Sequence, residues 1–96
     1  MIVHIVMFKF KEENKALNLA KVKHRLEKLE EQIDVLKSME VGMNFTESPR
    51  AYDMSLYSTF ESRADLKIYA EHEAHLQVLE LIKEVTVDSK VVDYLL

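Results

Sequence analysis

The most informative stretch of the sequence is IVHIVMFKF, residues 2–10. Its β-branched and aromatic residues are typical of a strand, and the run is too short for a buried helix. Neither face of this strand is polar. One face carries Val3, Ile5 and Met7, and the other carries Ile2, His4, Val6, Phe8 and Phe10. Because a sheet covered on one side only shows polar alternation, the pattern predicts a central strand covered on both faces.

Two later segments have helical periodicity. In residues 13–36, apolar side chains recur every three or four positions. This stripe consists of Val22, Leu26, Leu29, Ile33 and Leu36. A second helix is predicted over 62–85, because Ser62 and Asp65 resemble an N-terminal capping box with Asp in place of Glu.

Three more segments are predicted to be strands: 38–46, 51–60 and 88–95. Gly42, inside the first of them, indicates a bulge or a close backbone approach. The resulting order, β-α-β-β-α-β, is that of the ferredoxin-like folds. We therefore expect an α+β protomer, 1–96 as a single domain, with two helices on one face of a four-stranded antiparallel sheet.

This arrangement leaves one face of the sheet without a cover. Val3, Ile5 and Met7 lie on that face whenever Val6 and Phe8 point at the helices. A contiguous apolar surface of this kind needs a partner. We predict a homodimer in which two sheets pack face to face, forming a dimeric α+β barrel.

The composition excludes several functional classes. With 13 Lys and Arg against 17 Asp and Glu, the net charge of −4 argues against a nucleic-acid partner. No apolar run reaches the ~18 residues of a membrane span, and the N-terminus lacks a signal-peptide pattern, so we expect no membrane association and a cytoplasmic protein. The absence of Cys excludes thiol chemistry, and Gly42 alone cannot build a phosphate-binding loop. We predict no cofactor.

Three histidines and one acid are candidates for acid–base chemistry. His4 lies among residues that we expect to be buried, either as a structural histidine or as a general acid or base. His72 and His75 are three residues apart, a spacing that brings imidazoles together on a helix, but no third ligand is evident and we predict no metal. Asp53 is the one acid in a position that looks enclosed, and no serine lies in a nucleophile elbow.

Four stretches in this order resemble one family over essentially the whole chain. They are HIVMFKFK at 4–11, VGMNF at 41–45, AYDMSLYSTFES at 51–62 and IYAEHEAH at 68–75. Together they are similar to the stress-responsive dimeric α/β-barrel (Dabb) family. The resemblance implies a ferredoxin-like protomer in a dimeric barrel, as the strand pattern predicts.

The resemblance also implies a site. Plant members of the family include stress-induced proteins and a polyketide cyclase, whose pocket lies between sheet and helices. The family positions fall on His4, Tyr69 and His75, where the histidine of the last pair takes a proton and the tyrosine holds a substrate carbonyl. Two further cyclase positions, a tyrosine and a histidine, are occupied here by Leu26 and Met54. The cyclase's own substrate is therefore not implied.

The expected pocket follows from these positions and from the strand faces. It consists of His4, Val6, Phe8, Leu26, Met54, Tyr69 and His75. Its lining is mostly apolar with a few polar groups, which is typical of small-molecule sites. Some relatives hold Mg²⁺ through backbone carbonyls at positions near 33–36, and such ligation has no side-chain signature.

Three functions remain open from the sequence, and whether the protein is an enzyme is among the open points. The first is small-molecule binding, with cyclase- or lyase-like acid–base activity on a carbonyl compound. The second is a non-catalytic structural or stress protein that acts as a dimer or higher oligomer. The third, a cofactor-independent monooxygenase, is disfavoured because the chain has no Trp.

Overall fold

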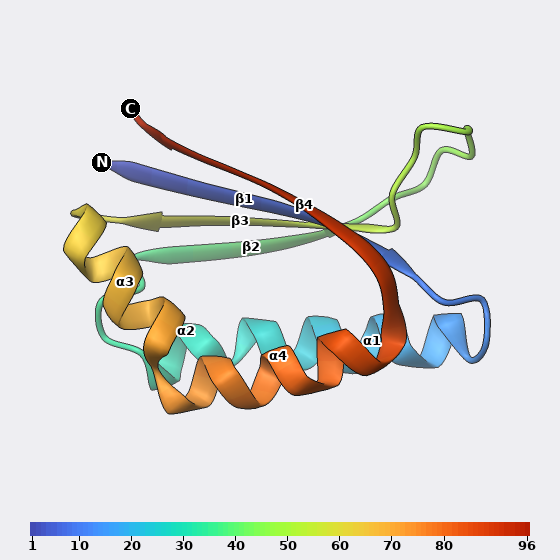
Figure 1. Cartoon of the computed structure of the whole chain (residues 1–96), viewed down its shortest axis with the longest axis horizontal. Helices are drawn as coiled ribbons and strands as arrows, with labels where there is room; N and C mark the ends of the chain where they lie inside the picture. Colours follow the sequence, from blue (N-terminus) through green and yellow to red (C-terminus); the bar gives the residue numbers. More distant parts are fainter.

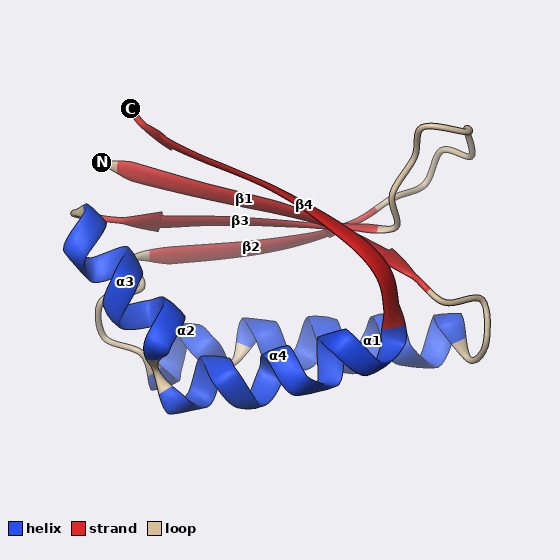
Figure 2. Cartoon of the chain, viewed as in Figure 1, coloured by secondary structure: helices blue, strands red, loops and turns tan.

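A computed structural model describes residues 1–96 and places a sheet on one side of the molecule and a helical layer on the other (Figure 1). The elements in chain order are β1 (Ile2–Phe10), α1 (Lys15–Glu27), α2 (Leu29–Gln32), β2 (Ser38–Met43), β3 (Met54–Phe60), α3 (Arg63–Glu71), α4 (Glu73–Val85) and β4 (Thr86–Leu95). Colouring by secondary structure shows the two layers separated, with every helix on the same side of the sheet (Figure 2). None of the helices has the length and apolar composition needed to cross a bilayer.

The sheet has the order β2-β3-β1-β4, and all neighbouring strands are antiparallel. Strand β1 therefore lies inside the sheet, with Val6 opposite Leu56 of β3 and Val91 of β4. This is the ferredoxin-like arrangement, so the predicted fold class is confirmed. Figure 1 shows α1 and α4 running below the sheet, and α3 lying near the end where both chain termini are found.

Each of the two predicted helices is divided in the structure. The first ends at Gln32 rather than residue 36, because Ile33 has an extended backbone with φ −125° and ψ 107°. The second breaks at His72, where ψ is 137°. The imidazole Nδ1 of His72 accepts a hydrogen bond from the backbone N–H of Ala74 at 3.0 Å, so this side chain caps α4. Periodicity alone missed the break because the apolar pattern continues through it.

The start of α3 agrees with the sequence. The hydroxyl oxygen of Ser62 accepts a hydrogen bond from the backbone N–H of Asp65 at 3.1 Å, so the predicted N-cap is present. This cap fixes the entry of the chain into the helix that carries Tyr69.

The strands are shorter than predicted at their loop ends, since β2 ends at Met43 and β3 begins at Met54. The pairing of β2 with β3 is regular, so Gly42 does not form a bulge. A Cβ atom at Gly42 would lie 3.4 Å from the hydroxyl oxygen of Ser55, which supports the close-approach alternative. The irregularity in the sheet lies instead where β1 pairs with β4, between Lys9 and Phe10.

The core fills the space between the sheet and the helices. Its most deeply buried members include Phe8, Phe10, Val22, Leu26, Leu29, Ile33, Leu56 and Phe60. The opposite side of the sheet is the open sheet face, which we define as Val3, Ile5, Met7, Tyr57, Val92 and Tyr94. Val3, toward one end of this face, is buried, whereas Met7 is 44% exposed and Val92 is 53% exposed.

Candidate functional site

The imidazole of His4 is held by an acid on the neighbouring strand. His4 of β1 lies directly opposite Asp93 of β4, and its Nδ1 is in hydrogen-bonding contact with a carboxylate oxygen of Asp93. Because an ionised carboxylate only accepts, Nδ1 carries the hydrogen and Nε2 is the free ring nitrogen. The His4 side chain is 16% exposed, and that of Asp93 is 46% exposed.

Two further groups approach His4 from the helical layer. Tyr69 lies in the last turn of α3 and His75 in the first turn of α4, on either side of the break at His72. The ring centroids of Tyr69 and His75 are 4.4 Å apart, and those of Tyr69 and His4 are 6.3 Å apart. The fold therefore gathers a phenol and two imidazoles, which we call the His4–Tyr69–His75 cluster.

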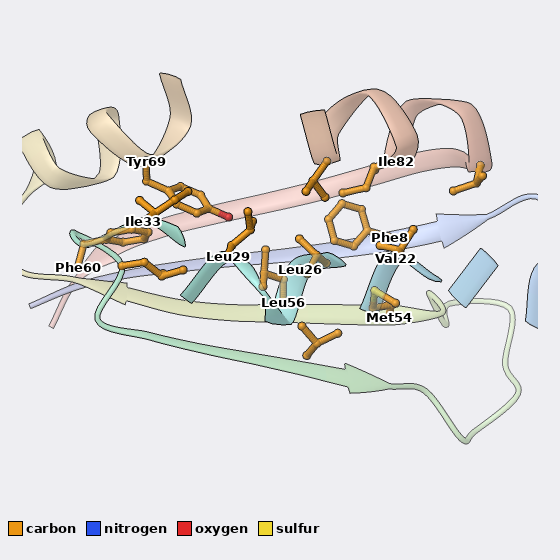
Figure 3. Close-up of a cluster of buried hydrophobic side chains, with 14 of the residues drawn as sticks. Phe8, Val22, Leu26, Leu29, Ile33, Met54, Leu56, Phe60, Tyr69 and Ile82 are labelled. Atoms are coloured by element: carbon orange, nitrogen blue, oxygen red, sulfur yellow. The ribbon is translucent and has the colours of Figure 1, made fainter. Parts of the chain in front are cut away.

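The hydroxyl group of Tyr69 has no hydrogen-bond partner although the residue is only 1% exposed. Its ring packs against Phe60, with centroids 5.1 Å apart. Figure 3 shows the hydroxyl pointing between the sheet and the helices, toward Leu29. Burial raises the pKa of Tyr69 well above its ordinary value, so the phenol stays protonated and acts as a hydrogen-bond donor.

His75 is held by its own helical region. Its Nδ1 lies 3.0 Å from the carbonyl oxygen of Ala70, and because a carbonyl only accepts, this nitrogen donates. Burial lowers the pKa of His75, and the neighbouring His4 and His72 lower it further. The ring is therefore neutral at pH 7, with an unprotonated Nε2.

Together these groups can take part in acid–base chemistry. A buried phenol donates a hydrogen bond to an oxygen such as a carbonyl, and stabilises negative charge that develops there. A neutral imidazole accepts a proton from a carbon or oxygen next to that group. The cluster supplies one such donor and two such acceptors in a largely dehydrated place.

The other predicted pocket residues lie elsewhere in the core. Phe8, Leu26 and Met54 are almost completely buried, and Val6 is partly buried against them. Figure 3 shows Phe8 and Met54 close to Val22, away from Tyr69. His4 and Phe8 are four strand residues apart, or about 13 Å. The structure thus brings together the three polar members of the predicted set, while the apolar members pack with the hydrophobic core.

A cavity of about 300 Å³ opens beside the His4–Asp93 pair. It is lined by Ile2, Arg63, Leu66, Asp93, Tyr94 and Leu95. Leu66 lies one helical turn before Tyr69, and Ile2 is two residues from His4 on the same strand face. We call this hollow the α3–β4 cavity.

Sequence reasoning missed Asp93 and Arg63. Asp93 falls inside the strand predicted over 88–95, and the signal that identifies it is the antiparallel register with β1. That register depends on where the chain leaves α4 and on the irregularity after Lys9, neither of which is evident from the residue pattern.

Other polar candidates have structural roles. A carboxylate oxygen of Asp53 accepts a hydrogen bond from the backbone N–H of Phe10 at 2.7 Å, and the other forms an ion pair with Lys15 at 2.9 Å. Asp53 therefore joins β1, β3 and α1. His72 caps α4, and no group of three His, Cys, Asp or Glu side chains is placed to hold a metal ion.

Comparisons with known proteins agree with this architecture. The family model described as the stress-responsive A/B barrel domain (Dabb) matches residues 2–96, so the chain belongs to the Dabb family. A dimeric protein of unknown function with a ferredoxin-like fold from Bacteroides fragilis is 31% identical, with a TM-score of 0.87 over 97% of this chain and 93% of that one. No curated protein matched the chain.

More distant solved structures share the fold. A Dabb family protein from Mesorhizobium loti is 21% identical, with a TM-score of 0.82 over 98% of this chain and 94% of that one. A hydroxynitrile lyase from Passiflora edulis is 16% identical, with a TM-score of 0.87 over 97% of this chain and 90% of that one.

The unpartnered hydroxyl of Tyr69 predicts an unusual effect on stability. A buried polar group without a partner costs free energy, so Tyr69→Phe should raise the free energy of unfolding by about 1 kcal/mol in urea titrations. Tyr52→Phe is the control, because the Tyr52 hydroxyl donates to Asp88 and its loss should not stabilise the protein. A destabilised Tyr69→Phe variant would contradict the assignment of an orphan hydroxyl.

The lowered pKa of His75 predicts a dependence of stability on pH. The unfolded chain takes up the proton near the ordinary histidine pKa, but the folded protein takes it up only at lower pH. Stability should therefore be unaffected by His75 above the ordinary pKa and fall as the pH drops below it. His75→Gln should show a shallower loss between pH 7 and 5, and NMR titration of the His75 ring protons should give a pKa below the ordinary histidine value.

Proposed function

We propose that this protein binds a small organic carbonyl compound at the His4–Tyr69–His75 cluster and catalyses a cyclase- or lyase-like proton transfer on it. The observation that carries the proposal is the buried hydroxyl of Tyr69, which has no partner within the protein. Buried donors are almost always satisfied, and an unsatisfied one is explained by a ligand that supplies the acceptor.

The roles of the residues follow from their hydrogen bonds. Tyr69 donates to the carbonyl oxygen of the ligand and stabilises the negative charge that develops on it. His75, neutral and oriented by Ala70, accepts the proton through Nε2. The same imidazolium returns this proton to the product, while His4, oriented by Asp93, presents a second unprotonated Nε2 near the phenol ring.

The α3–β4 cavity supports this proposal because it offers an approach to the cluster. Its volume of about 300 Å³ lies at the small end of ligand pockets, which favours a compact substrate. The apolar residues Phe8, Leu26 and Met54 belong to the hydrophobic core and do not line this cavity.

A ligand screen tests the proposal. Small carbonyl compounds such as cyclohexanone and benzaldehyde should raise the melting temperature by several degrees at ten times Kd. The variants His75→Ala and Tyr69→Phe should lose most of this shift. His24→Ala is the matched control, because His24 is exposed on α1, and it should keep the shift. Equal shifts in wild type and both cluster variants would show that the site lies elsewhere.

We also propose that the functional unit is a homodimer formed through the open sheet face. The apolar side chains of that face are partly exposed in one protomer, and the relative from Bacteroides fragilis is described as dimeric. Packing two such faces together covers them, and the same surface on both copies gives two-fold symmetry. The alternative of a non-catalytic protein, whose role is the assembly itself, rests on this same face.

Sedimentation tests the dimer. Wild type should sediment as a dimer at micromolar concentration, whereas Ile5→Asp should be monomeric because it places a charge at the centre of the open sheet face. Val91→Asp is the control, since Val91 is apolar and exposed but lies on the other face of the sheet. A monomeric wild type, or an equal effect of the control, would rule out this interface.

A further inference from the structure

The α3–β4 cavity has an uneven distribution of charge. Two of its lining residues are charged, Arg63 in the first turn of α3 and Asp93 on β4. The carboxylate of Asp93 is engaged by His4. The guanidinium of Arg63 forms no ion pair or hydrogen bond with any group of the protein, although the chain has 17 acidic residues. Arg63 is therefore the one cation in the lining of this cavity, and it has no partner within the protein.

The remainder of the lining is mainly apolar. Ile2 forms part of the buried core, and Leu66 of α3 is partly buried against that core. Leu95 is exposed, so it borders the cavity from the solvent side. A molecule seated here would contact hydrocarbon on several sides and a single unpaired guanidinium at one end.

These observations identify a class of ligand. The planar guanidinium donates two parallel hydrogen bonds to a carboxylate, and such charge-assisted pairs are stronger than bonds between neutral groups. We propose that the α3–β4 cavity binds small apolar carboxylates, with the carboxylate on Arg63 and the apolar body against Ile2, Leu66 and Leu95. This inference rests on the proposed function and names the substrate class for the same site.

The position of Arg63 relative to the His4–Tyr69–His75 cluster indicates what its pairing with a carboxylate would do. Arg63 and Leu66 face the cavity from the first turns of α3, and Tyr69 follows one turn later on the same helix. A ligand anchored at Arg63 and seated against Leu66 lies one helical turn from Tyr69 and beside Asp93, the partner of His4. Arg63 is thus a positioning residue, which acts by fixing one end of the substrate while the cluster acts on the other.

Benzoate and benzamide provide a matched pair of probes, since they have nearly the same shape and differ in charge. In NMR titrations of the ¹⁵N-labelled full chain at low salt, benzoate should shift the amide signals of Leu66, Asp93 and Leu95. Its Kd should be at least about tenfold lower than that of benzamide, the difference expected for one charge-assisted pair. The preference should decrease as salt is added.

Variants of Arg63 test whether its guanidinium is the charge that binds benzoate. Arg63→Gln should abolish the preference for benzoate, and Arg63→Lys should keep only part of it because the lysine lacks the planar fork. Lys67→Gln is the control, since Lys67 is an exposed cation on the same helix that does not line the cavity, and it should behave like wild type. Melting temperatures of all variants show whether each is folded.

Equal binding of benzoate and benzamide, an unchanged preference in Arg63→Gln, or benzoate-induced shifts confined to other parts of the chain would overturn the inference. Its failure is distinguishable from failure of the proposed function. If neutral carbonyl compounds still stabilise wild type but not Tyr69→Phe, only the carboxylate preference is lost. If no carbonyl compound stabilises wild type either, both proposals fall.

Discussion

The fold depends on burying both apolar faces of strand β1. This strand pairs with β3 on one side and β4 on the other, so it lies inside the sheet. Its side chains are apolar on both faces, and each face needs its own cover. The helical layer covers one of them, with Phe8 and Phe10 pointing into the core. The other face carries Val3, Ile5 and Met7, and no helix of the same protomer covers it (Figure 2).

His4 is the one polar residue on the helix-facing side of this strand. Its hydrogen bond to Asp93 explains how an imidazole is tolerated among apolar side chains. His4 is flanked on the same face by Ile2 and Val6, in a region where an unpaired charge or donor is costly. Asp93, on the adjacent strand β4, accepts a hydrogen bond from Nδ1 of His4. The ring centroid of Tyr69 lies 6.3 Å from that of the imidazole. The same contacts that make the imidazole tolerable also orient its remaining nitrogen.

Much of the fold could be predicted from the residue pattern because it depends on local periodicity. The two-sided strand at residues 2–10, the stripe from Val22 to Leu36 and the cap at Ser62 each indicate an element without reference to distant parts of the chain. The same dependence on periodicity explains why the two helix breaks were not predicted. At Ile33 and His72 the apolar spacing continues, and only a backbone angle or a side-chain hydrogen bond ends the helix.

The candidate site was predictable only in part. The resemblance to the Dabb family indicated His4, Tyr69 and His75, and the structure brings these three together. It did not indicate Asp93 or Arg63, because their roles depend on the register of β4 and on the placement of α3 beside it. Phe8 shares a strand face with His4 and pairs with Met54 of β3, but distance along the strands separates both from the cluster.

The break at His72 gives the cluster a property of its own. Tyr69 and His75 belong to different helices, so their relative orientation is set by the backbone angles of a single connecting residue rather than by one rigid helical repeat. The cap that holds this joint is a side chain that makes no contact with the proposed substrate. Substitutions at the joint can therefore change the orientation of the His75 imidazole relative to the Tyr69 phenol, which the core holds against Phe60. In the proposed function, changes at this one hinge would redirect the proton transfer without replacing the groups assigned to it.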